Sequence, residues 1–223
     1  MATRQVLAEL TAAYRAASGV EVAIESVGGV DAAKRIASGE AFDVVILAAD
    51  AIDKLIAGAS VLPDSRVDLV RSPVAIAVRE GAPLPDVSNE DTLRRAVLAA
   101  SSLGYSTGPS GTALLALFAR WGLAEQLRSR IVQAPAGVPV AQLVAEGRVE
   151  LGFQQLSEML TAPGIRVVGG MPIGTEIITT FSGGVCAASP QPEAVRALLA
   201  FMQSPAAADT ICRYGMEPAQ EPT

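Results

Sequence analysis

The apolar residues of this 223-residue chain follow two periods, one typical of helices and one typical of strands. Residues 2–17 repeat apolar positions every three or four residues, which predicts an amphipathic helix that stops at Gly19. Residues 20–27 alternate apolar and polar positions, which predicts a strand. The β-branched run at 42–48 is typical of a strand buried on both faces of a parallel sheet. We therefore predict alternating helices and strands, as in α/β domains.

Two short helices fit between and after these strands. Residues 31–38 are helical in pattern, with Asp31 as the expected N-cap and Gly39 as the terminator. Asp50 opens the next predicted helix, which runs through Ala57.

Two long strand-like runs divide the chain into two predicted lobes. The runs at 67–79 and 175–189 are too long and too apolar for loops, so each is predicted to leave one lobe and enter the other. Lobe one would comprise residues 1–74 plus 179–223, and lobe two residues 75–178. Two such hinge strands predict closure of the lobes about a ligand in the cleft between them.

The region between the two runs repeats the α/β alternation. A helix is expected after Ser88, which is a good N-cap with Asp91 three residues on. The other predicted strands are 103–107, 131–134, 150–155 and 165–169, and the other predicted helices are 112–127, 138–147, 192–203 and 205–214. The expected fold class is α/β, with a mixed sheet flanked by helices in each lobe.

Composition excludes several classes of function. The chain has a net charge of −6, 4% aromatic residues and no basic run, so it lacks the features of a nucleic-acid binder. No run reaches the roughly 18 apolar residues of a transmembrane helix, so we expect a soluble globular protein. Histidine is absent, which excludes histidine metal sites and histidine-based catalysis. No cofactor and no metal are expected.

The two cysteines, Cys186 and Cys212, leave two interpretations open. Free cysteine behaves as a small apolar residue, which favours two buried, inert thiols. A disulfide would need the two Cα atoms within about 7 Å, which the sequence does not test.

The segment from Tyr105 to Thr112 is the strongest candidate for chemistry. It joins a predicted strand to a predicted helix and holds Ser106, Thr107, Ser110 and Gly111. Hydroxyls and unpaired backbone amides at a helix N-terminus form an anion site, helped by the helix dipole. The segment is neither a P-loop nor a Rossmann fingerprint, and the alternative is a well-capped turn.

Similar positions recur at other predicted strand ends and helix starts. They are Gly28 and Gly29, Arg71 and Ser72, Val138, and Gln154 with Gln155. Ligands of open α/β sheets lie beyond the carboxyl ends of strands, so together these positions indicate a site for a small anion.

Three further motifs resemble one known family. They are the strand motif at 39–50, the strand at 149–153, and the closing helix at 201–207 with the Tyr-Gly-Met-Glu-Pro ending at 214–218. Together they resemble the type II periplasmic substrate-binding proteins, and within them the molybdate-binding-like group. The resemblance implies a two-lobed solute-binding protein that serves an ABC transporter permease if it is exported.

The resemblance also implies ligand residues. The group's first ligand hydroxyl corresponds to Thr3, its second falls in the Gly28–Gly29 turn, where no hydroxyl exists, and its tyrosine falls near Gln155. These differences favour a carboxylate over molybdate. Arg71 would be the bidentate partner of such a ligand, or else a surface arginine.

Two other functions stay open beside solute capture. Some proteins of this group resemble aconitate isomerases, which move a double bond by moving a proton and need neither metal nor histidine. The ionisable residues nearest the candidate loops are Asp31, Tyr105, Glu158 and Glu176, each of which is otherwise a surface or capping residue. A cytosolic sensor is the third function. The chain as given predicts a cytoplasmic protein, or a periplasmic one if the true start lies upstream of Met1.

Overall fold

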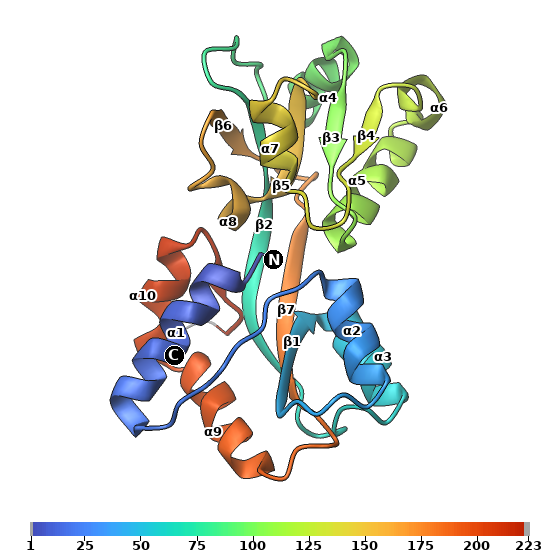
Figure 1. Ribbon diagram of the computed structural model, residues 1–223. Coiled ribbons are helices and arrows are strands. Elements are labelled where there is room, and N and C mark those ends of the chain that lie inside the picture. Colours follow the sequence, from blue (N-terminus) through green and yellow to red (C-terminus); the bar gives the residue numbers. More distant parts are fainter. Residues whose placement is uncertain (1, 221–223) are drawn as a thin grey trace. The chain divides into compact units, whose positions relative to one another are not determined.

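The chain folds into two compact units, each built of helices and strands. The computed structural model describes residues 2–220 (Figure 1). Unit 1 holds the chain up to Ser72 together with the chain from Thr179 onward, and unit 2 holds Pro73–Ile178. The chain therefore crosses twice, once within β2 (Val67–Arg79) and once at the start of β7 (Ile178–Val185).

The strands of unit 1 pair antiparallel. β1 (Val44–Ala48) pairs with β7 along its whole length, from Val44 opposite Val185 to Ala48 opposite Phe181. The first half of β2 pairs with the short strand β8 (Glu217–Pro218). The parallel arrangement predicted for β1 is therefore wrong, because its described partner runs in the opposite direction.

Five helices pack against these strands in two apolar clusters. They are α1 (Arg4–Ser18), α2 (Gly29–Ala37), α3 (Ala49–Ala57), α9 (Pro192–Met202) and α10 (Pro205–Arg213). Leu10, Leu199 and Met202 belong to the cluster that α1, α9 and α10 share. Ile52 belongs to the second cluster, formed by α2, α3 and β1.

Unit 2 is a mixed sheet. The second half of β2 runs antiparallel to β5 (Leu151–Gln155) and to β6 (Ile165–Gly170). Beyond β5, β3 (Leu103–Tyr105) runs parallel to both β5 and β4 (Ile131–Gln133).

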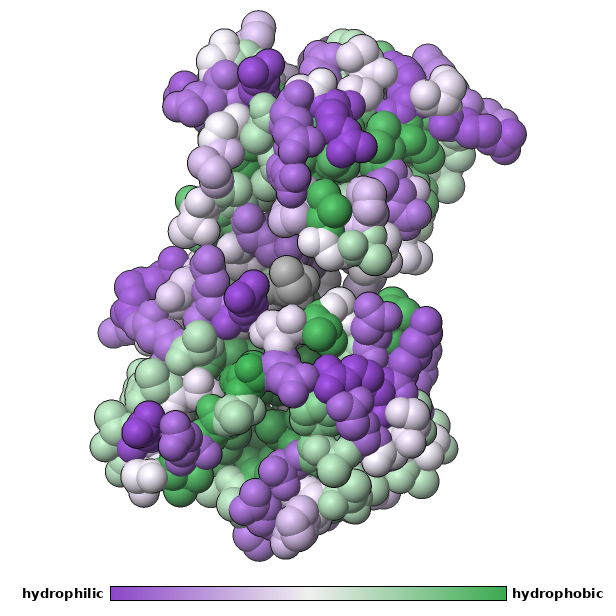
Figure 2. Space-filling model, in the orientation of Figure 1, coloured by the Kyte–Doolittle hydropathy of each residue, from purple (hydrophilic) through white to green (hydrophobic). Residues whose placement is uncertain are grey.

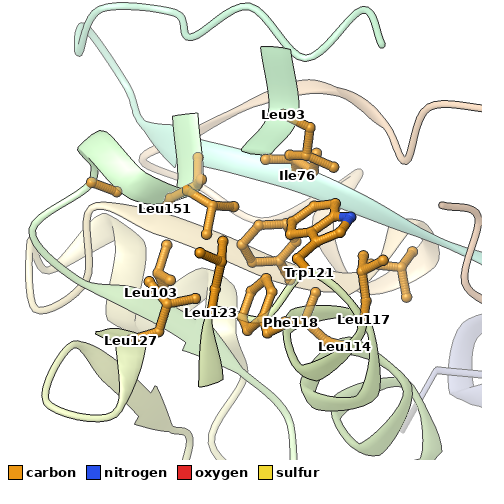
Figure 3. Packing of buried hydrophobic residues seen from close by; sticks show 14 of the residues in the cluster. Ile76, Leu93, Leu103, Leu114, Leu117, Phe118, Trp121, Leu123, Leu127 and Leu151 are labelled. Carbon is orange, nitrogen blue, oxygen red and sulfur yellow. The ribbon is translucent and has the colours of Figure 1, made fainter. Parts of the chain in front are cut away.

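The helices of unit 2 bury one large core and two smaller apolar clusters. These helices are α4 (Glu90–Ala99), α5 (Pro109–Arg120), α6 (Ala124–Leu127), α7 (Val140–Ala145) and α8 (Leu156–Met159). Figure 3 shows Phe118 and Trp121 among the leucines of this core, with Ile76 of β2 nearby. The Trp121 indole Nε1 donates to Glu90 Oε1 at 2.6 Å, so the one polar atom of that ring is satisfied.

The strand predicted at 20–27 does not form. This segment has no regular secondary structure, and Val20, Ile24 and Val27 are exposed. Among residues 2–220, no backbone–backbone hydrogen bond involves residues 21–27. A hollow of about 120 Å³, lined by Ile24, Val27 and Ile46 among others, lies between the segment and β1. The alternating pattern was present, but a strand also needs an adjacent edge with which to pair.

Two predicted helix caps also differ. α2 begins at Gly29 with Gly28 as N-cap, so Asp31 lies in the first helical turn. A carboxylate at this position stabilises the helix through its interaction with the helix dipole. α4 is capped by Asn89 instead of Ser88. The Asn89 side chain accepts from the Thr92 amide at 3.0 Å, and Thr92 Oγ1 accepts from the Asn89 amide at 3.1 Å.

Both cysteines are free. Cys186 is buried, and burial raises the pKa of its thiol to about 11, so it is inert at neutral pH. Cys212 is exposed on α10, whose buried face carries Ala207 and Ile211. The prediction of two buried thiols is therefore wrong for Cys212.

The face of the molecule drawn in Figure 2 is mixed in character. It intersperses hydrophilic and hydrophobic side chains. Within residues 2–220, no helix combines the length and the hydropathy needed to cross a bilayer.

Candidate functional site

The candidate site lies at one edge of the unit 2 sheet. Because β3, β4 and β5 are parallel, their carboxyl ends meet at the same edge. Three segments leave from there: the loop from Ser106 into α5, the loop before α7, and α8, which follows β5 directly (Figure 1). We call this region the carboxyl edge of unit 2.

The loop from β3 into α5 brings two hydroxyls together. Ser106 Oγ and Ser110 Oγ lie 3.0 Å apart, and Ser110 is only 5% exposed. Pro109 lies in the first turn of α5, and the N-cap residue Gly108 offers no side-chain hydrogen bond. The amino end of α5 therefore lacks a side-chain cap and keeps its positive dipole end available to an anion.

Gly111 makes this close packing possible. A Cβ atom at this position would lie 1.9 Å from the backbone oxygen of Ser106, which no side chain can tolerate. Glycine therefore lets the first turn of α5 fold against the end of β3, with Ser110 beside Ser106.

A buried glutamine links the other two segments. Gln154, which is 3% exposed, accepts a hydrogen bond from the Ala141 amide at 3.0 Å through Oε1. Its Nε2 donates to Glu158 Oε2 at 2.7 Å. The end of β5, the first turn of α7 and the carboxylate of α8 are thereby fixed to one another.

Glu158 has a distinctive environment. Burial raises the pKa of its carboxyl, and the hydrogen bond from Gln154 opposes that rise. Next to it, the buried Ser157 hydroxyl has no hydrogen-bond partner in the described part of the chain. The sequence indicated Glu158 only as one of four ionisable candidates, and the spacing of four residues from Gln154 was the local signal for their contact.

The predicted residues divide between the two units. The carboxyl edge of unit 2 carries Ser106, Thr107, Ser110, Gly111, Val138, Gln154 and Gln155. The Val138 amide donates to Pro135 O at 3.0 Å, so it closes a turn before α7.

The remaining predicted residues belong to unit 1. They are Thr3, Gly28, Gly29, Arg71 and Ser72. Thr3 is the buried N-cap of α1 and makes no capping hydrogen bond, and Ser72 is a fully buried hydroxyl without a partner among residues 2–220. The Arg71 guanidinium lies 3.5 Å from the Glu217 carboxylate on β8, so a neighbouring strand already offers it a counter-charge.

The chemistry of the carboxyl edge suits an anion better than a cation. Its groups are hydroxyls, amides and one half-buried carboxylate, that of Glu158. Within residues 2–220, no three His, Cys, Asp or Glu side chains gather in a way that could hold a metal ion. Ser and amide donors satisfy the lone pairs of a bound carboxylate without burying further charge.

The class of protein follows from the two α/β units and from the path of the chain through them. The chain begins in unit 1, continues through unit 2 and ends in unit 1. The fold is that of the type II periplasmic solute-binding proteins, of the molybdate-binding-like group. It aligns with the periplasmic molybdate-binding protein of Azotobacter vinelandii at a TM-score of 0.80 and 19% identity, covering 99% of this chain and 96% of that one. The sulfate-binding protein SubI of Mycobacterium tuberculosis aligns at 0.77 and 17% identity, over 96% of this chain and 83% of that one.

Sequence comparison narrows the class. Residues 1–217 match the model of the bacterial extracellular solute-binding proteins, and the chain belongs to that family. The chain is also 42% identical, over 216 residues, to an aconitate isomerase from a Pseudomonas species. That match covers 94% of this chain and 82% of the relative.

Proposed function

We propose that this protein binds aconitate, or a closely related small tricarboxylate, and isomerises it by moving a double bond. The observation that carries the proposal is the 42% identity to an aconitate isomerase over 94% of the chain. The more distant structural relatives share the fold, and their own ligands do not decide the ligand of this chain.

The carboxyl edge of unit 2 supports a carboxylate ligand. The uncapped amino end of α5 and the Ser106–Ser110 hydroxyl pair offer neutral donors to an anion. A ligand with several carboxylates could accept hydrogen bonds from several such donors at once.

The reaction is also compatible with this residue set. A methylene proton of aconitate is acidic because its removal leaves a negative charge delocalised over the double bond and the attached carboxylates. Such a proton transfer requires a positioned acid/base, but that group need not be a histidine. The reaction is therefore open to this chain, which contains no histidine.

The second candidate function is solute capture without turnover, favoured by the family match over residues 1–217. In that case the chain would deliver its ligand to an ABC transporter permease outside the cytoplasm. Both functions use the same carboxylate site, so they differ in turnover and partner and not in ligand class.

One experiment tests the proposal. Purified protein is incubated with trans-aconitate, and proton NMR follows the appearance of cis-aconitate, while calorimetry measures binding of trans-aconitate, citrate, sulfate and molybdate. We expect catalytic conversion, together with tighter binding of trans-aconitate than of sulfate or molybdate. Binding without conversion would instead establish solute capture, and preference for molybdate would refute the tricarboxylate ligand.

A further inference from the structure

The carboxyl edge of unit 2 contains few groups that can carry a proton. Among the described residues 105–111, 134–140 and 154–159, the ionisable side chains are Tyr105 and Glu158. A proton shift between two carbon atoms at this edge therefore has few possible carriers.

The surroundings of Glu158 differ from those of the ion-paired carboxylates of unit 2, such as Glu90 and Glu125. Glu90 lies 3.1 Å from Arg120, and Glu125 lies 2.6 Å from Arg128. No described Lys or Arg lies within ion-pair distance of Glu158, which is held by the neutral amide of Gln154 at 2.7 Å. A carboxylate fixed by a neutral donor keeps more of its basicity than one paired with arginine.

Gln154 also fixes the position of this carboxylate. Its Oε1 is bound to the Ala141 amide, so the side-chain amide has one orientation, with Nε2 directed at Glu158. Gln154 is buried and Glu158 is half-buried, so the contact is partly shielded from water. The carboxylate is thus preorganised at the same edge as the Ser106–Ser110 pair.

We propose that Glu158 is the catalytic acid/base of the isomerisation and that Gln154 is its positioning residue. This inference rests on the proposed function. It identifies the side chain that contacts the reacting carbons of the tricarboxylate.

The proton balance is simple. The Glu158 carboxylate takes a proton from the methylene carbon, and the electron pair of that C–H bond forms a new double bond to the central carbon. The original double bond opens, and its pair bonds to the proton that Glu158 returns to the former vinyl carbon. The carboxylate is regenerated, and no oxidant, reductant or other reactant is needed. Burial, which raises the pKa of Glu158, favours the protonated intermediate state of this carboxyl.

The test compares E158Q with E150Q. Glu150 is the matched control, because it also belongs to unit 2 but precedes β5 and accepts from the Ser101 hydroxyl at 2.6 Å. For E158Q we expect isomerisation of trans-aconitate to fall by at least about 100-fold and deuterium uptake from D₂O into the substrate to fall equally. The Kd for trans-aconitate should stay within about threefold of wild type. E150Q should match wild type in all three measurements.

Each other outcome is decisive. An E158Q variant that isomerises within about threefold of wild type overturns the role of Glu158, whereas a wild-type protein that never isomerises aconitate refutes the proposed function. E158D keeps the carboxylate and covers the case in which E158Q folds poorly. We expect E158D to retain measurable deuterium uptake, because it keeps a carboxylate at this position. An E158D that melts early and loses binding together with activity would show a structural role and overturn the proposal.

Discussion

At the scale of single residues, the Ser106–Ser110 pair is the part of the site that can be tested most directly. Replacing Ser110 with alanine removes one buried hydroxyl donor at the amino end of α5. We expect the Kd for trans-aconitate to rise about tenfold, the equivalent of about 1.4 kcal/mol. The melting temperature without ligand should fall by no more than about 4 °C, because one neutral hydrogen bond contributes about 1 kcal/mol. Calorimetry and thermal unfolding provide the two measurements.

Ser101→Ala is the control for this prediction. Its hydroxyl also makes a hydrogen bond in unit 2, to Glu150 at 2.6 Å, but it lies away from the carboxyl edge. The control should leave the affinity unchanged. If Ser110→Ala lowers stability and leaves affinity intact, the segment serves only to start α5.

At the scale of elements, the segment at 20–27 gives a prediction of its own. Because its residues 21–27 make no backbone–backbone hydrogen bond within the described chain, their amides should exchange with solvent quickly. The amides of β1 that bond to β7 should be protected over much longer times. Hydrogen–deuterium exchange followed by mass spectrometry checks this. Equal protection of residues 21–27 and β1 would show that the segment is paired in solution.

The same segment shows what sequence patterns can and cannot predict. The strand predicted at 67–79 is confirmed as β2 over Val67–Arg79. A long β-branched run can be recognised as a strand without knowing which strand lies next to it. The run at 20–27 has an equally regular pattern, but its pairing depends on an edge that local sequence does not describe. In the site, the Ser106–Gly111 loop was predictable because its residues are contiguous. The contact from Gln154 to Ala141 depends on how β5 and α7 pack, and no sequence pattern encodes it.

At the scale of the whole molecule, the net charge of the chain leads to a prediction about how salt affects ligand affinity. The chain carries a net charge of −6, so a tricarboxylate approaches a protein of its own sign. At the carboxyl edge of unit 2, the donors are hydroxyls and amides, and the described residues 105–111, 134–140 and 154–159 include no Lys or Arg. Salt screens interactions between full charges over about 10 Å at 0.1 M, but it has little effect on short hydrogen bonds from neutral donors.

We therefore expect affinity for trans-aconitate to change by less than about threefold between 20 and 300 mM NaCl. Any change should be towards tighter binding, because screening reduces the repulsion between the anionic ligand and the anionic protein. Calorimetry at both salt concentrations measures the effect. Affinity that falls more than about tenfold with added salt would contradict a site of neutral donors. It would favour a cationic partner such as Arg71, which would then have to exchange its contact with Glu217 for the ligand. Repeating the titration with Arg71→Ala separates the two cases. A site of neutral donors predicts that the salt dependence of the affinity is unchanged. An ion pair between Arg71 and the ligand predicts that the salt dependence disappears together with most of the affinity.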